Sequence, residues 1–389
     1  MTETRPAMSQ GHLTALDGLR GAMAYWVLLG HVFAHTGMHW VPILASPKYA
    51  VNGFMLLSGF LMTWHYVRRA PQEPWTSWRT WCAFYVRRFF RISPLYYLLL
   101  IPSYLLLGSY RVWHGVGAQD PGLAAAPLNW QNVLSHITYL YGLSPTFHAS
   151  LPIPDWSISL EMQFYLAFPF LMLLVLRFGW PALCIVSGLI WYVTSLPALG
   201  MVTTFDLPSP LFLSLIWFAI GMVWAGRYAV DHKPHLPSIL MGYLLAFFSR
   251  DLHDILLVIG FGFVLFVSDV PVLGKMAGAC RRVLSCRVAT FMAEASYSVY
   301  LVHLLILRPL AYFLVTRTQL TPDQRGIVAL VLTTAGSYSL AVLLHPVEVW
   351  GISIGRKLAK RISGAVPSIQ VRVPISQHAP EPVIVSRTG

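Results

Sequence analysis

The sequence has few charged residues and few cysteines. Asp, Glu, Lys and Arg make up 11% of its 389 residues, less than half of the roughly 25% found in soluble globular domains. The hydrophobic fraction is 56%, so the composition argues against an ordinary soluble enzyme and predicts a membrane protein. The four cysteines show no paired metal-ligand spacing, and Cys82, Cys280 and Cys286 fall in segments predicted below to be cytoplasmic. A disulfide framework is therefore not expected.

Acidic residues are scarcer than basic ones, with 15 Asp and Glu against 27 Lys and Arg and a formal net charge of +12. Such an excess also occurs in nucleic-acid-binding proteins. Here the cations lie between apolar runs, which favours an orienting role in a membrane, and no nucleic-acid partner is expected. The sequence has no cleavable signal-peptide pattern. It also has no clear internal repeat, and the lack of a repeat disfavours a transporter built from inverted repeats.

Long apolar runs dominate the sequence. A helix needs about 20 mostly apolar residues to cross the hydrocarbon core of a bilayer. We therefore predict an all-α, polytopic membrane helix bundle with about ten transmembrane helices. The predicted spans are residues 16–36, 49–66, 92–108, 158–176, 180–199, 209–226, 236–249, 255–273, 288–314 and 326–346.

The distribution of Lys and Arg predicts the orientation of these helices. With the amino and carboxyl termini both cytoplasmic, 21 of the 27 cations lie on the cytoplasmic side and 6 on the outer side, as the positive-inside rule requires. We predict a cytoplasmic segment over 1–15, a membrane domain over 16–361 and a disordered cytoplasmic tail over 362–389. Residues 67–91 form a basic cytoplasmic loop. Residues 109–157 form a long outer segment, whose apolar stretch 133–143 lies along the surface.

The first span contains ionisable residues that are costly in lipid. Asp17 lies one turn before Arg20, and His31 follows on the same helix face, about 16 Å farther along the axis. Asp17 and Arg20 fit either a helix start with a snorkelling arginine or part of a site. His31 fits either a helix-packing histidine or a base or nucleophile, because imidazole exchanges protons near neutral pH. His35 lies one turn on, but no third ligand is apparent, so no metal is predicted.

The fourth span opens with a tryptophan and a carboxylate. Glu161 enters from the predicted outer side at about the depth that His31 reaches from the inner side, so the two residues are expected to meet. A carboxylate beside an imidazole orients the ring and raises its basicity. The alternative is an interfacial glutamate that faces water. Trp156 is a further candidate, although an aromatic-belt anchor explains it better than a substrate platform.

Three arginines, Arg87, Arg88 and Arg91, lie close together in the basic loop. Arg88 and Arg91 are three positions apart, on the same side of a helical turn. Such a pair can hold phosphate oxygens in forked hydrogen bonds. Positive-inside topology or binding to anionic lipid explains the same residues equally well.

The ninth span contains Ser298, Tyr300 and His303 at positions where apolar residues would cost less. All three are candidate site residues. Ser298 and His303 are five positions apart and share a helix face poorly, so a serine–histidine dyad within this segment is not expected.

Five short segments, taken in their order along the chain, form a recognisable set. They are Leu16-Asp17-Gly18-Leu19-Arg20-Gly21 with the following His31, Asn52-Gly53-Phe54-Met55-Leu56-Leu57-Ser58-Gly59-Phe60-Leu61, Arg87-Arg88-Phe89-Phe90-Arg91-Ile92-Ser93-Pro94, Trp156-Ser157-Ile158-Ser159-Leu160-Glu161 and Ser296-Tyr297-Ser298-Val299-Tyr300-Leu301-Val302-His303. This set resembles the acyltransferase-3 family, the integral membrane O-acyltransferases of bacteria. The family commonly has Phe-Phe where this chain has Gly53-Phe54. Some members carry an extracytoplasmic SGNH-type hydrolase domain, which is not expected here because only a short tail follows the bundle.

The resemblance implies transfer of an acyl group, usually acetyl from acetyl-CoA, to a hydroxyl of a carbohydrate or a glycosylated small molecule. By matching positions, Arg20 and His31 correspond to the family's essential first-span pair. Acyl-CoA is expected as a co-substrate, without a bound cofactor, with its thioester near His31. The predicted catalytic residues are His31, Glu161, Arg20 and Asp17, and the predicted CoA-binding residues are Arg87, Arg88 and Arg91.

Two mechanisms fit these residues. In direct transfer His31 is the general base and Glu161 orients it, whereas in a two-step transfer a protein nucleophile first carries the acyl group. Direct transfer is favoured because Ser298 and Ser159 have no evident local base.

The favoured acceptor is a surface or exported carbohydrate, such as a polysaccharide, lipopolysaccharide or oligosaccharide. A macrolide or other glycosylated secondary metabolite is the alternative acceptor, and a lipid-linked sugar transporter is a distant alternative function. The expected location is the bacterial cytoplasmic or inner membrane, with acyl-CoA, the acceptor and membrane lipid as partners.

Overall fold

The computed structural model describes residues 10–38, 44–114, 123, 126–231, 234–267 and 270–363. Within these ranges all regular structure is helical and no strand is present, which confirms the predicted all-α class. The elements are α1 (Gln10–Thr36), α2 (Pro47–Arg69), α3 (Trp78–Leu105), α4 (Leu107–His114), α6 (Trp130–Ile137), η1 (Leu140–Leu143), α7 (Trp156–Phe178), α8 (Trp180–Thr194), η2 (Pro197–Leu199), α9 (Met201–Thr204), α10 (Leu211–Asp231), α11 (Leu236–Phe247), α12 (Leu252–Phe266), α13 (Pro271–Leu284), α14 (Arg287–Arg317) and α15 (Pro322–Ser363).

Four of the described helices, α7, α10, α14 and α15, are long and apolar enough to cross a membrane. The helices α12 and α13 would make a fifth span as a bent pair, with axes that differ by 95°. The apolar helices α8 and α11 have only 15 and 12 residues, fewer than the about 20 that a span needs. These helices fit a membrane bundle, while the count of ten spans and the cytoplasmic termini stay predictions.

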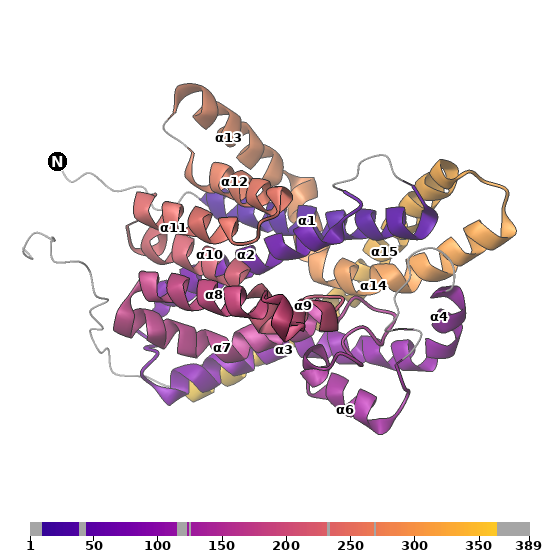
Figure 1. Cartoon of the computed structure of the whole chain (residues 1–389), viewed down its shortest axis with the longest axis horizontal. Coiled ribbons are helices and arrows are strands. Elements are labelled where there is room, and N and C mark those ends of the chain that lie inside the picture. Colours follow the sequence, from indigo (N-terminus) through magenta and orange to yellow (C-terminus); the bar gives the residue numbers. More distant parts are fainter. Residues whose placement is uncertain are drawn as a thin grey trace, which may run out of the picture.

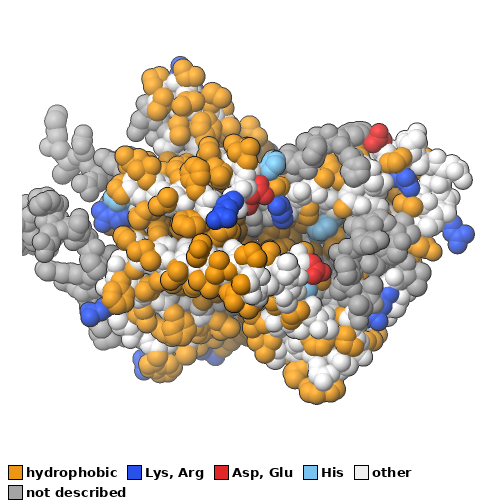
Figure 2. Space-filling view, viewed as in Figure 1, with side chains coloured by type: hydrophobic (Ala, Val, Ile, Leu, Met, Phe, Trp, Pro, Cys, Tyr) orange, Lys and Arg blue, Asp and Glu red, His pale blue; other side chains and the backbone are white. Residues whose placement is uncertain are grey.

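The longest helices lie side by side along the long axis of the molecule (Figure 1). The packing of α2 on α10 is especially close, because a Cβ on Gly59 would lie 2.2 Å from the Phe218 carbonyl oxygen. A Cβ on Gly221 would lie 2.0 Å from the carbonyl oxygen of Leu56. Glycine is needed at both positions to let the backbones approach. Hydrophobic side chains cover much of the visible face, as expected for a surface that meets lipid (Figure 2).

The predicted cytoplasmic loop over 67–91 is wrong in its second half, because α3 already begins at Trp78. Buried Trp75 packs just before this start, and its carbonyl accepts a 2.7 Å hydrogen bond from Trp81 Nε1. The aromatic side chains therefore fix the entry into the helix. As a result, the three clustered arginines stand on a helix rather than on a loop.

The predicted span over 255–273 is interrupted. α12 ends at Phe266, and α13 begins at Pro271 in a different direction. The Arg281 guanidinium folds back and donates to the carbonyl oxygens of Val264 and Val267, at 2.8 and 3.1 Å. These carbonyls have no partner within α12 once that helix ends, so the arginine stabilises the break.

At both ends of the chain the helices extend beyond the predicted spans 16–36 and 326–346, and the predicted domain boundaries stay predictions. α1 begins at Gln10 instead of residue 16, and α15 continues through Pro346 to Ser363. Residues 1–9 and 364–389, which make up most of the predicted terminal segments, lie outside the described residues.

The described part of the predicted outer segment covers the start of α7. Buried His136 lies 3.3 Å from the carboxylate of Asp155 through its Nε2 atom. The hydroxyl of Tyr141 donates to the backbone carbonyl of Asp155 at 2.7 Å. Asp155 is only 1% exposed, so α7 begins inside the protein. The outward side of α6 is apolar and exposed, which fits a helix at the membrane surface, through Trp130, Leu134 and Ile137.

Candidate active site

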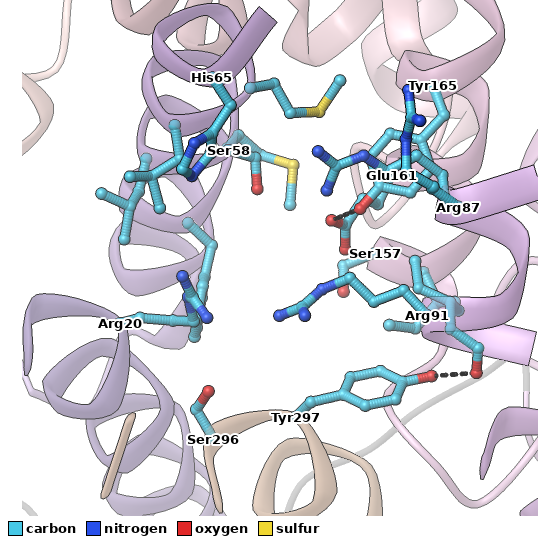
Figure 3. Close-up of a pocket in the computed structure, with 18 of the residues that line it drawn as sticks. Arg20, Ser58, His65, Arg87, Arg91, Ser157, Glu161, Tyr165, Ser296 and Tyr297 are labelled. Carbon is cyan, nitrogen blue, oxygen red and sulfur yellow. Dashed lines mark hydrogen bonds between the residues drawn. The ribbon is translucent and has the colours of Figure 1, made fainter. Parts of the chain in front are cut away.

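A cavity of about 460 Å³ lies between α1, α2, α3, α7, α14 and α15 (Figure 3). Its lining combines a cationic group with an apolar group of side chains. The charged lining residues are Arg20, Arg69, Arg87, Arg88, Arg91 and Arg356, with Asp17 and Glu161. The apolar lining includes Val51, Phe54, Met55, Leu57 and Leu61. Six arginines against two carboxylates make this a strongly positive cavity, which focuses an attractive potential on an anion.

Arg20 and Arg91 point toward one another across the cavity (Figure 3). The two guanidinium groups are close enough for the charge of Arg91 to act on Arg20. Arg20 also pairs with Asp17 at 3.0 Å, as its position one turn later predicted. Asp17 is about half exposed, with 49% of its side chain accessible. Arg20 and Arg91 repel one another, and the half-exposed Asp17 carboxylate offsets only part of this repulsion. An anion bound between the two guanidinium groups would stabilise the arrangement.

Arg88 is held from three sides by aromatic rings. Its guanidinium carbon lies 5.8, 5.7 and 5.4 Å from the ring centres of Tyr66, Phe84 and Tyr165, distances at which cation–π attraction is significant. Its buried Nε has no hydrogen-bond partner in the described part of the chain. The rings therefore fix this cation in the cavity wall.

Arg87 differs from its neighbours because its guanidinium already has a partner. Its Nη1 and Nη2 atoms donate to both carboxylate oxygens of Glu73, at 2.9 and 2.7 Å, and its Nε donates to the Tyr66 hydroxyl at 3.0 Å. This bidentate pair fastens the 70–77 turn to α3. Arg87 also lines the cavity, and its hydrogen bonds to Glu73 and Tyr66 favour a structural role, while its assignment to phosphate binding stays a prediction.

Removal of the Glu73 carboxylate is therefore expected to destabilise the fold. Glu73 and Arg87 are 13% and 15% exposed, so Glu73→Ala would leave a nearly buried guanidinium unpaired and cost about 3 kcal/mol of unfolding free energy. An SDS-unfolding titration of the purified protein measures this cost. An unchanged midpoint would contradict the structural role.

Lys48 and Asp251 provide a matched control for this titration. They form an ion pair at 3.0 Å with the lysine 56% exposed, so Lys48→Ala is expected to change the unfolding free energy by less than about 1 kcal/mol. Burial raises the pKa of Asp251, but hydrogen bonds from Lys48, the His253 amide and Tyr49 outweigh it and lower this pKa to about 2. The control pair therefore stays charged at neutral pH.

The predicted contact between His31 and Glu161 is not found. Glu161 lines the cavity and accepts a hydrogen bond from Tyr165, one turn later on α7 (Figure 3). His31 contacts His303 instead, and it is not among the residues that line this cavity. The depth estimate assumed that α7 starts at the surface. Because buried Asp155 precedes it, Glu161 lies deeper, beside the arginines.

His31 and His303 form a hydrogen-bonded pair between α1 and α14. The Nε2 atom of His303 lies 3.0 Å from Nδ1 of His31, with ring centres 5.0 Å apart. Nδ1 of His303 lies 3.1 Å from the carbonyl oxygen of Val299. A carbonyl can only accept, so Nδ1 of His303 carries the hydrogen and its Nε2 accepts from His31. This pattern leaves Nε2 of His31 unprotonated, which is the state that a general base requires.

The remaining candidates take different positions. Tyr300 lines the cavity and shares a 2.7 Å hydrogen bond with Ser157, the residue after Trp156. Trp156 is partly buried and packs against the hydrophobic core. Ser298 donates to Glu348 from α15, not to His303. Among the described residues, no group of three or more His, Cys, Asp or Glu side chains is placed to hold a metal ion.

Three further polar residues were not predicted as site residues, and two of them, His65 and Arg356, line the cavity. His65 lines it, and its signal was an imidazole within the second span, one turn before the arginine at position 69. Glu348 was missed because the tenth span was ended at residue 346, whereas α15 continues past this carboxylate to Ser363. Arg356 was counted only as a topological cation, although it lies at the cavity.

Comparison with known proteins identifies the family. The acyltransferase-3 family model, described as an acyltransferase domain, matches residues 13–345. The chain therefore belongs to this family. Family membership and the apolar helices together indicate a multi-pass membrane protein. No solved structure gives a significant match.

Three similar proteins illustrate the range of relatives. The chain is 23% identical over 280 residues to Nose resistant to fluoxetine protein 6 of Caenorhabditis elegans, covering 62% of this chain and 33% of that protein. It is 29% identical over 223 residues to Acyltransferase MdmB of Streptomyces mycarofaciens, covering 53% and 52%. It is 23% identical over 328 residues to a protein of Staphylococcus aureus (strain COL) named as an O-acetyltransferase, covering 76% and 51%. The aligned part of the chain thus spans a third to about half of each relative, and the names support an O-acyltransferase.

Proposed function

We propose that this protein transfers an acyl group, most simply acetyl, from acyl-CoA to a hydroxyl group of a surface or exported carbohydrate. The observation that carries the proposal is the arginine-lined cavity in which Arg20 and Arg91 face one another. CoA is a polyanion with a long, uncharged arm in which methylene and methyl groups alternate with two amides, so its phosphates suit Arg20, Arg88 and Arg91 while the arm follows the apolar wall. The proposed location is the bacterial cytoplasmic membrane, with CoA entering from the cytoplasm.

Direct transfer suits the histidine pair. Nε2 of His31 takes the proton of the acceptor hydroxyl as the oxygen attacks the thioester carbon. The C–S bond then breaks, and the departing CoA sulfur receives that proton, so the products are an ester and free CoA. His303, rather than Glu161, holds the His31 tautomer that can accept a proton. A two-step route by way of Ser298 is disfavoured, because its hydroxyl donates a hydrogen bond to Glu348 and neither residue lines the cavity.

The test uses the full chain, purified in detergent and supplied with radiolabelled acetyl-CoA and oligosaccharides extracted from the source membrane. The expected result is labelled ester together with an equal amount of free CoA thiol. Neither a lipid-linked sugar transporter nor a scaffold would consume acetyl-CoA. Absence of ester with glycans, together with acylation of a glycosylated small molecule, would reassign the acceptor while retaining the reaction.

A substitution at His303 separates positioning from binding. His303→Ala removes the acceptor for the His31 Nδ1 hydrogen, and we expect kcat to fall about 10- to 100-fold, as for other residues that orient a reacting imidazole. KM for acetyl-CoA should stay within about twofold. His303→Gln offers a carbonyl oxygen at a similar position and should recover part of the rate. Equal kcat values for the alanine, glutamine and wild-type proteins would remove His303 from the mechanism.

A further inference from the structure

Two hydroxyl groups from different helices meet in the cavity wall, near the histidine pair. Tyr300 of α14 lies one turn before His303, and their ring centres are 6.1 Å apart. Its hydroxyl lies 2.7 Å from Oγ of Ser157, in the first turn of α7. Both side chains are 5% exposed and both line the cavity. The Tyr300 ring therefore lies beside His303, and its hydroxyl and that of Ser157 belong to the cavity wall.

The tyrosine ring is fixed in place. Phe54 packs against it edge to face, with ring centres 6.1 Å apart and planes at 72°. Ser157 is the second residue of α7 and lies two positions after the buried N-cap residue Asp155, so its backbone is also fixed. A hydroxyl held by packing on two sides keeps its direction without cost at the moment of reaction, which is what makes a hydrogen-bond donor catalytically effective.

The hydroxyl groups of Tyr300 and Ser157 carry two hydrogens between them, and only one is used in their mutual hydrogen bond. Each hydroxyl has one hydrogen and can accept up to two hydrogen bonds. The bond between Tyr300 and Ser157 uses one of the two hydrogens, and no further hydrogen bond of either hydroxyl is formed within the described residues. One O–H donor therefore remains for a group in the cavity. Tyr297 and Tyr165 also line the cavity, but their hydrogens are donated to the Ile92 carbonyl and to Glu161.

We propose that the Tyr300 hydroxyl, supported by Ser157, donates a hydrogen bond to the carbonyl oxygen of the acyl-CoA thioester. This inference rests on the proposed function and adds a catalytic donor to it. When the acceptor oxygen forms its bond to the carbonyl carbon, the π electron pair moves onto the carbonyl oxygen. The Tyr300 O–H stabilises this negative charge, while Ser157 donates to the tyrosine oxygen. The pair returns when the C–S bond breaks, and Tyr300 keeps its proton throughout.

The experiment compares Tyr300→Phe, Ser157→Ala and the double variant in detergent-purified full-length protein. We expect Tyr300→Phe to lower kcat about 100-fold, with KM for acetyl-CoA and the calorimetric Kd of CoA within about twofold of wild type. Ser157→Ala should lower kcat less, by about 10-fold, and the double variant should resemble Tyr300→Phe because the two residues act as one unit.

Tyr85→Phe is the matched control. This tyrosine lies outside the cavity lining and donates to the Leu166 carbonyl at 3.1 Å, so its kcat should equal that of wild type. A wild-type kcat in Tyr300→Phe, or a loss confined to KM and Kd, would overturn the assignment while leaving the proposed reaction intact. Failure of the wild-type protein to form any ester would instead overturn the proposed function, and this assignment with it.

Discussion

Purified protein carrying His31→Ala is expected to lose about 1000-fold in the rate of acyl transfer, within the range that a positioned general base contributes. The reason is the hydrogen-bond chain from Val299 through His303, which leaves Nε2 of His31 as a free acceptor. CoA binding should be unchanged, because His31 does not line the arginine cavity. The measurement is kcat with labelled acetyl-CoA, alongside the calorimetric Kd of CoA.

Two controls sharpen this result. His253→Ala removes a histidine that is 48% exposed, outside the cavity lining, and should leave kcat unchanged. Added imidazole should restore part of the rate in His31→Gly, because a free base can occupy the vacated space. If His31→Ala retained more than about a tenth of the wild-type kcat, the imidazole would act in helix packing.

The family segments and the helical content were accessible from sequence because both are local properties. Asp17 and Arg20 on α1, and Arg88 and Arg91 on α3, carry their signal in the spacing within each pair, and the structure brings both pairs to one cavity. The apolar runs predicted helices at most of the right places, since burial of backbone groups in lipid permits little else. The break between α12 and α13 was missed because it depends on Arg281 reaching back to carbonyls 14 and 17 residues away.

The contacts of His31 and Glu161 could not be predicted from the sequence, because they depend on the depth in the protein at which each helix begins. The sequence placed both residues at similar distances from opposite surfaces. The segment before α7 is folded into the protein, with Asp155 buried, and this shifts Glu161 toward Arg20 and Arg88. His303 was identified as a candidate, but its alignment with His31 depends on the contact of α1 with α14. A serine partner five positions away on the same helix was correctly set aside.

Replacement of Arg91 by alanine is expected to weaken CoA binding about 30-fold, because a charge-assisted hydrogen bond to phosphate contributes about 2 kcal/mol. Arg91 faces Arg20 in the cavity and is one turn from Arg88, so it sits among the three cations assigned to phosphates (Figure 3). Arg91→Lys keeps the charge but not the planar fork, and it should recover only part of the affinity. The measurements are the Kd of CoA and the KM for acetyl-CoA, which should rise together.

Arg79 supplies the matched control on the same helix. It is exposed, outside the cavity lining, near the first turn of α3. Arg79→Ala removes the same charge from α3, so a long-range effect of net charge would weaken CoA binding equally in both variants. A loss confined to Arg91→Ala, and smaller at high salt because screening weakens the wild-type interaction first, indicates direct contact with phosphate. Equal Kd values for Arg91→Ala and wild type would mean that CoA does not occupy this cavity, because a cavity-lining guanidinium that faces Arg20 must contribute to the binding of any polyanion placed between them.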